Sequence, residues 1–193
     1  MGMNSILLES LNQYYDISIN KNKLLEVLTD EGIVSLRIID WFVTNYSKKN
    51  NIYYPIFKTS TNEKTFFKGN NQLVKQFNTY HSYKSQLKSF SKKRFDPFCR
   101  RDRIKFYCNG GDMIETTIGQ LNFFKWAIDN LIIDYIKDNY EEIELDMNNS
   151  YNLIKKQKKD KKENKERKKR QELSKSASRG LNSNKIKVIL DFT

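Results

Sequence analysis

The sequence predicts an α+β fold in which N-terminal helices precede a small antiparallel sheet. A hairpin near 103–118, a long packing helix, a basic helical or disordered extension and a C-terminal strand follow. Apolar residues recur at helical spacing near the N-terminus and after residue 118, while short aromatic runs fill the middle. With 193 residues, 38% of them hydrophobic, and a net charge of +12, the chain can form one compact domain with a solvated extension. We therefore expect a domain over 1–147, an extension over 148–184 and a strand over 185–193.

Three helical patterns open the chain. Residues 5–15 place leucines on one face, and residues 21–31 repeat the pattern until Gly32 supplies a stop. In 35–47 Ser35 is a suitable N-cap for a helix with a wide apolar face. A helix-turn-helix motif is disfavoured, because the second helix offers a single Arg37 rather than several base-reading side chains.

Strand patterns follow from residue 51. The runs 51–58, 63–69 and 72–77 are short and β-prone, and Pro55 indicates that the first run lies at a sheet edge. RIKFYC and MIETTI flank the turn NGGD, which is the strongest hairpin signal in the chain. Alternation in RIKFYC places Cys108 on the core face and Lys105 and Tyr107 on the opposite face.

The segment 119–140 carries the longest apolar stripe, and Thr116 or Thr117 can cap it as one helix at the centre of the core. The Lys/Glu-rich middle of the extension favours a helix through i,i+4 ion pairs. The final run KIKVILDFT returns to a β pattern. It should dock as a strand on this domain or on a partner.

Charge is divided into three blocks. Residues 75–105 hold ten basic residues against two acids, and residues 129–146 hold seven acids against Lys137. Residues 155–179 hold thirteen basic residues against four acids. Blocks of one sign either bind an oppositely charged partner or bind each other. The basic tail could also be a passive solubilising linker.

The segment 80–103 interleaves cations with aromatic side chains, a combination that suits phosphate contacts and base stacking. Spacing at four would align Lys84, Lys88 and Lys92 on one helix face. The expected stacking residues are Tyr80, Tyr83, Phe90 and Phe98. The expected nucleic-acid-binding cations are Lys84, Lys88, Lys92, Lys93, Arg94, Arg100, Arg101, Arg103 and Lys105 in the domain, with Lys158, Lys161, Lys162, Arg167, Lys168, Lys169 and Arg170 in the tail.

A structural role of the arginines competes with nucleic-acid binding. In that role Arg100, Arg101 or Arg103 pairs with Asp96, Asp102 or the acidic block.

Enzyme signatures are poor. The chain has no phosphate-binding glycine motif and no HExxH, and Asp112 and Glu115 lack the lysine that a nuclease carboxylate pair would require. Cys99, Cys108 and His81 fall short of a four-ligand zinc cluster and of a disulfide scaffold. We expect reduced thiols, no metal, no cofactor and no enzymatic activity.

The strings DPFCRRDRI and TTIGQLNFFKWAI, with VSLRIIDWFVTNYSKKNNI, make the chain resemble a poorly characterised protein group of nucleocytoplasmic large DNA viruses, including mimivirus-like giant viruses. The resemblance covers roughly residues 33–192. It implies a protein that acts in the viral factory of the host cytoplasm or in the virion, and it transfers no catalytic residues. The sequence also shows no secretory signal and no bilayer-spanning run, so we expect neither secretion nor a membrane contact.

Two functions follow from these observations. The first is non-enzymatic nucleic-acid binding, with DNA favoured over RNA, in transcription or genome organisation. The alternative is a virion structural or assembly protein that binds acidic protein partners through the basic tail and viral proteins through the C-terminal strand.

Overall fold

The structure is a computed structural model that describes residues 3–28, 32–107 and 113–163. The chain divides into two units, Met1–Ser150 and Tyr151–Thr193. Helix α8 (Tyr140–Glu163) crosses this division, and the predicted domain boundary at residue 147 also falls inside it. The predicted strand 185–193 lies outside the described residues. The first unit contains helices and small antiparallel sheets, which confirms the predicted α+β class.

The N-terminal helices form where the apolar spacing places them. These are α1 (Met3–Tyr15), α2 (Ser18–Leu28) and α3 (Leu36–Trp41), and the Ser35 hydroxyl caps α3 by accepting from the Ile38 amide at 3.4 Å. A π-helical turn, η1 (Phe42–Tyr46), continues α3 into the short α4 (Ser47–Lys49). In this segment Ser47 donates to the Val43 carbonyl, a bond that competes with the regular helical pattern.

The first sheet has the strand order β2-β1-β3. Its antiparallel strands are β1 (Tyr53–Lys58), β2 (Lys64–Thr65) and β3 (Gln72–Asn78). The prediction that the strand containing Pro55 lies at a sheet edge is wrong, because β1 is the central strand. Pro55 is tolerated there because β2 pairs only with Phe57 and Lys58 of β1. Pro55 therefore has a neighbour on one side only, Gln76 of β3.

The predicted hairpin strands are confirmed. Strands β4 (Arg103–Tyr107) and β5 (Met113–Thr117) pair antiparallel, with Lys105 opposite Glu115. Phe106 is buried and Ile104 half-buried, whereas Lys105 and Tyr107 are exposed, as the alternation predicts. The turn between the strands and Cys108 lie outside the described residues.

The single long helix predicted over 119–140 is instead two helices, α6 (Ile118–Asp129) and α7 (Ile132–Asp138). Thr117 caps α6 as expected, accepting from the Gln120 amide at 3.1 Å. The break follows at Leu131, whose φ of 55° is left-handed. Asn130 holds this break, because its side-chain amide donates to the Trp126 carbonyl and its own carbonyl accepts from the Tyr54 hydroxyl at 2.7 Å.

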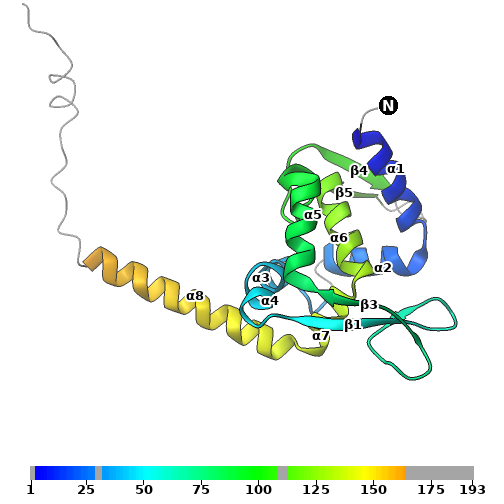
Figure 1. Ribbon diagram of the computed structural model, residues 1–193. Helices are drawn as coiled ribbons and strands as arrows, with labels where there is room; N and C mark the ends of the chain where they lie inside the picture. The colour runs from blue at the N-terminus through cyan, green and yellow to red at the C-terminus, as the bar shows by residue number, and fades with distance from the viewer. Residues whose placement is uncertain (1–2, 29–31, 108–112, 164–193) are drawn as a thin grey trace, which may run out of the picture. The chain divides into compact units, whose positions relative to one another are not determined.

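Helices α5 (Thr79–Arg94) and α6 pack against each other between the first sheet and the β4–β5 hairpin (Figure 1). Rings from both helices and the following loop form the centre of this packing. Phe95 lies 5.3 Å from Phe123 and 5.4 Å from Trp126 between ring centroids, and Tyr83 lies 6.0 Å from Phe95. These contacts fix one face of α5 toward the core and leave its opposite face for solvent.

Candidate nucleic-acid interface

The acidic block is used inside the domain. The Asp134 carboxylate pairs with Lys23 at 2.8 Å, and the Asp129 carboxylate pairs with Lys64 at 3.0 Å. Asp146 pairs with Lys49. Glu142 accepts from the Tyr46 hydroxyl at 2.6 Å. Within the described residues, none of these acids pairs with Arg100, Arg101 or Arg103. The acidic block therefore does not neutralise these three arginines of residues 75–105, which we call the basic segment.

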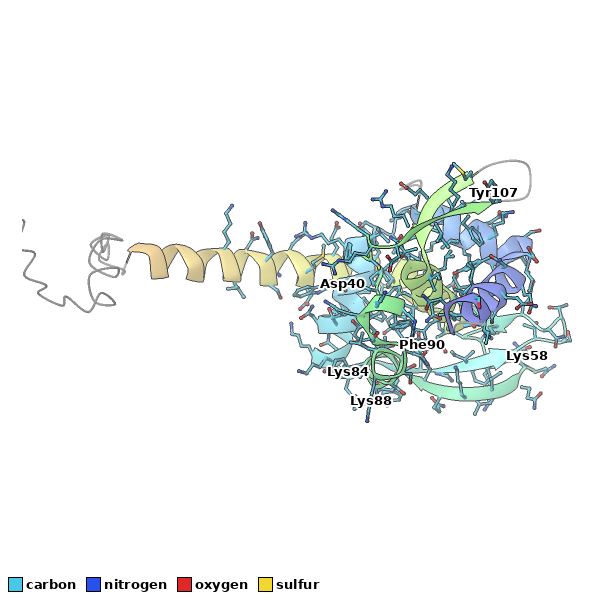
Figure 2. The ribbon with its side chains drawn as sticks, turned by 90° about the horizontal axis from the view of Figure 1, so that it is seen from above. Asp40, Lys58, Lys84, Lys88, Phe90 and Tyr107 are labelled. Atoms are coloured by element: carbon cyan, nitrogen blue, oxygen red, sulfur yellow. The ribbon has the colours of Figure 1, made fainter. Side chains whose placement is uncertain are left out.

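The exposed face of α5 carries Lys84 and Lys88 on successive turns. Figure 2 shows both side chains on the side of α5 that faces away from the domain. Near the start of the same helix, the Lys48 ammonium lies 5.6 Å from the centroid of the Tyr80 ring, and Tyr80 is half-buried. Lys84 and Lys88 thus form a pair of cations presented to solvent by a rigid element.

The predicted alignment of Lys92 with Lys84 and Lys88 is wrong. Ser91 has φ 59° and ψ 166°, so the helix is interrupted one residue before Lys92. Lys93, beyond this kink, pairs with Asp102 at 3.4 Å, and Arg94 donates to the Asn4 side chain at 2.7 Å. Beyond the kink, Lys93 and Arg94 therefore contact other parts of the domain.

Asp40 of α3 lies near Lys92 and is half-buried. Burial and the nearby Asp96 carboxylate raise the pKa of Asp40, and the Lys92 ammonium opposes that rise. The folded state therefore binds the proton of Asp40 more tightly than the unfolded state, and this group makes the fold less stable as the pH rises through its pKa.

Replacing Asp40 by asparagine is expected to raise the urea midpoint of unfolding at pH 7 and to leave it unchanged at pH 3. At pH 3 the carboxyl group is already protonated in both states, so the substitution removes no charge there. The measurement is urea denaturation at both pH values, with Asp16→Asn as an exposed control. A midpoint that falls at pH 7 would contradict the expectation.

The loop after α5 and strand β4 carry the remaining domain cations. Asp96 and Pro97 form the predicted turn, in which the Phe98 amide donates to the Asp96 carboxylate at 2.9 Å. Arg100 and Arg101 then follow as exposed residues. Arg103 forms an ion pair with Glu115 across the hairpin rather than with the acidic block, while Lys105 is exposed beside them.

The four predicted stacking residues differ in exposure. Tyr83 is 8% exposed and packs against Phe95 and Trp126, so it lacks the open ring face that base stacking requires. Phe90 is half-buried and stacks on Phe95. Phe98 is 41% exposed, and Tyr80 keeps part of its surface open. The burial of Tyr83 corrects the expectation that all four rings accompany the cations at the surface.

Tyr107 is the most exposed ring near the basic segment, at 71%. It lies on the same face of β4 as Arg103 and Lys105, and it was absent from the predicted stacking set. The alternation in RIKFYC is the signal that identifies it, because that pattern places Tyr107 opposite the buried Phe106.

The basic segment therefore forms two surfaces rather than one. The first, the helix surface, consists of Lys84 and Lys88 on α5. The second, the ribbon surface, consists of Arg103, Lys105 and Tyr107 on β4. Figure 2 places Lys84 and Lys88 well apart from Tyr107, on opposite sides of the view. A two-stranded antiparallel ribbon of this kind has the dimensions to enter a nucleic-acid groove.

The tail cations divide between described and other residues. Lys158, Lys161 and Lys162 lie within the helix α8, which continues to Glu163. Arg167, Lys168, Lys169 and Arg170 lie outside the described residues. The beginning of the basic tail is thus helical.

No group of three or more His, Cys, Asp or Glu side chains in the part of the chain that the structure describes is placed to hold a metal ion. None of its helices combines the length and apolar character that crossing a membrane requires.

Comparison with known proteins places the sequence among uncharacterised relatives. Residues 3–179 match the model of a family described as a family of unknown function, DUF7197. An uncharacterised protein of Acanthamoeba polyphaga mimivirus is 40% identical over 129 residues, which are 64% of this chain and 45% of that protein. The chain therefore spans less than half the length of this relative. No solved structure matches. These findings confirm the resemblance to a poorly characterised giant-virus group.

Proposed function

The chain belongs to this family of unknown function, DUF7197, and we propose that it is a non-enzymatic nucleic-acid-binding protein. One observation carries the proposal. Six exposed cations between residues 84 and 105 take part in no ion pair among the described residues, although the domain has many carboxylates. They are Lys84, Lys88, Lys92, Arg100, Arg101 and Lys105.

Phosphate is the partner that suits such a set, because phosphate contacts supply most of the affinity of sequence-independent nucleic-acid binding. Exposed rings beside the cations add the capacity to stack on unpaired bases. Phe98 and Tyr107 meet that condition. An acidic protein surface would use the cations but would have no comparable use for the rings, so nucleic acid is the better match. DNA in a giant-virus factory or virion is the form and setting that we propose.

Fluorescence anisotropy of the full chain with labelled DNA and RNA, as duplexes and single strands, tests this function. We expect Lys84→Gln with Lys88→Gln, and separately Arg100→Gln with Arg101→Gln, to weaken binding about tenfold or more, since each pair removes two phosphate contacts. The matched control is Lys58→Gln with Lys68→Gln, which removes two exposed charges elsewhere. Equal weakening by the control, or no binding at low salt, would contradict the proposal. The second result would favour acidic protein partners.

Tyr107→Ala is expected to weaken single-strand binding by about 1–3 kcal/mol and duplex binding much less, because only unpaired bases can stack on the ring. Tyr53→Ala is the control, since Tyr53 is similarly exposed on β1, away from the ribbon surface. The same anisotropy titration measures both variants. Equal losses for duplex and single strand would exclude stacking by Tyr107.

A further inference from the structure

A second group of cations gathers away from the helix and ribbon surfaces. Lys64 of β2, Lys75 of β3 and Lys125 of α6 line a hollow of about 360 Å³, which we call the lysine hollow. Asp129 is the one acid among its lining residues, all of which are described. The volume lies within the range of small-ligand sites in proteins.

The three ammonium groups outnumber their carboxylate. Lys64 and Lys125 approach opposite oxygens of Asp129, each at 3.0 Å. Lys75 instead donates to the neutral side-chain amide of Asn130 at 2.6 Å. With all three lysines charged, the lysine hollow carries a surplus of two positive charges, which matches the charge of a phosphate monoester near neutral pH.

The surplus of positive charge disfavours the charged form of Lys75. Burial and the neighbouring Lys64 ammonium lower the pKa of Lys75, while Asp129 opposes that shift. Burial raises the pKa of Asp129, but hydrogen bonds from Lys64 and Lys125 outweigh that effect and hold the pKa of Asp129 below its ordinary value. A bound dianion would relieve the repulsion between Lys64 and Lys75 without displacing Asp129.

Aromatic side chains complete the walls. Phe90 and Trp126 both line the lysine hollow, and the Trp126 indole N–H is held by the Ser82 hydroxyl at 3.0 Å. In Figure 2 Phe90 lies on the side of α5 opposite Lys84, so the helix presents this ring to the lysine hollow and its lysines to solvent. Phe90, one of the four expected stacking residues, therefore faces the lysine hollow rather than the helix surface.

We infer that the lysine hollow binds a phosphate monoester attached to a planar ring, the chemistry of a mononucleotide. This inference is independent of the proposed function, because the site shares no residue with the helix or ribbon surface. The phosphate would contact the three lysines and the ring would lie against Phe90. Both a free nucleotide and the 5′-phosphorylated end of a strand carry this chemistry.

Isothermal titration calorimetry of the full chain with adenosine 5′-monophosphate, adenosine and inorganic phosphate tests the site. We expect the monophosphate to bind at least tenfold more tightly than either adenosine or inorganic phosphate. Lys75→Gln should weaken it at least tenfold, and the exposed control Lys58→Gln less than twofold. Equal affinity for adenosine or for inorganic phosphate, equal losses in the two variants, or no binding at millimolar concentration would overturn the inference.

A measurement on the unsubstituted chain guards against a variant that misfolds. Amine acylation followed by mass spectrometry should show that the monophosphate protects Lys64, Lys75 and Lys125 but not Lys58. Absence of that protection would also overturn the inference. Repeating the protection with a 5′-phosphorylated dinucleotide and its 5′-hydroxyl counterpart identifies the source. Protection by the phosphorylated form indicates a strand end, and protection by the mononucleotide alone indicates a free nucleotide.

Discussion

Replacing Phe95 by alanine is expected to lower the free energy of unfolding by about 3–5 kcal/mol. Phe95 is 1% exposed, and its ring contacts Tyr83, Phe90, Phe123 and Trp126. Removing the ring takes away buried apolar surface and leaves a cavity that rings from two helices cannot all move to fill. Urea denaturation followed by far-UV circular dichroism measures the change.

Phe98 is the matched control for this substitution. It has the same side chain three residues later but is 41% exposed. Phe98→Ala should therefore change the free energy of unfolding by about 0.5 kcal/mol or less. Similar losses in the two variants would show that Phe95 does not occupy the centre of the packing between α5 and α6.

Nucleic-acid affinity is expected to fall about a thousandfold between 50 and 200 mM monovalent salt. Six phosphate contacts, one for each of the six unpaired cations between residues 84 and 105, contribute about −5 to the slope of log K against log [salt] on duplex DNA. Anisotropy titrations at four or five salt concentrations measure that slope. A slope near zero would exclude phosphate contacts as the source of affinity.

Charge variants apportion the same slope between domain and tail. Lys84→Gln with Lys88→Gln should make the slope shallower by about 2, because two counterion-releasing contacts are lost. Glutamine at Lys158, Lys161, Lys162, Arg167, Lys168, Lys169 and Arg170 tests the tail without removing the chain that follows it. An unchanged slope in the domain variant would exclude phosphate contacts by Lys84 and Lys88.

The parts of the fold that the sequence predicted depend on neighbours in the chain. Ser35 and Thr117 cap their helices because a hydroxyl side chain at that position reaches the backbone amide three residues later. The β4–β5 pairing follows from alternation around a short turn. The break at Leu131 escaped prediction because the preceding Asn130 is held by the hydroxyl of Tyr54, a residue 76 positions before Asn130.

The candidate sites divide in the same way. Exposure of Lys84 and Lys88 follows from helical spacing. The kink at Ser91 that separates Lys92 from them requires a positive φ, which serine seldom adopts. Tyr83 is buried because Phe95 and Trp126 pack on it from elsewhere in the chain. The lysine hollow escaped prediction since its three lysines come from three separate elements.

The long-range pairs between the first and last thirds of the domain have a consequence for the order of folding. Lys23, Glu26, Trp41, Tyr46 and Lys49 make side-chain contacts with partners 96 to 111 residues further along the chain. During synthesis, α2 to α4 emerge long before these partners exist. Contacts of such high sequence separation make folding slow, because a long loop must close first. The N-terminal helices should therefore reach their final packing only after residue 146 has left the ribosome, and fragments that end earlier should aggregate more readily.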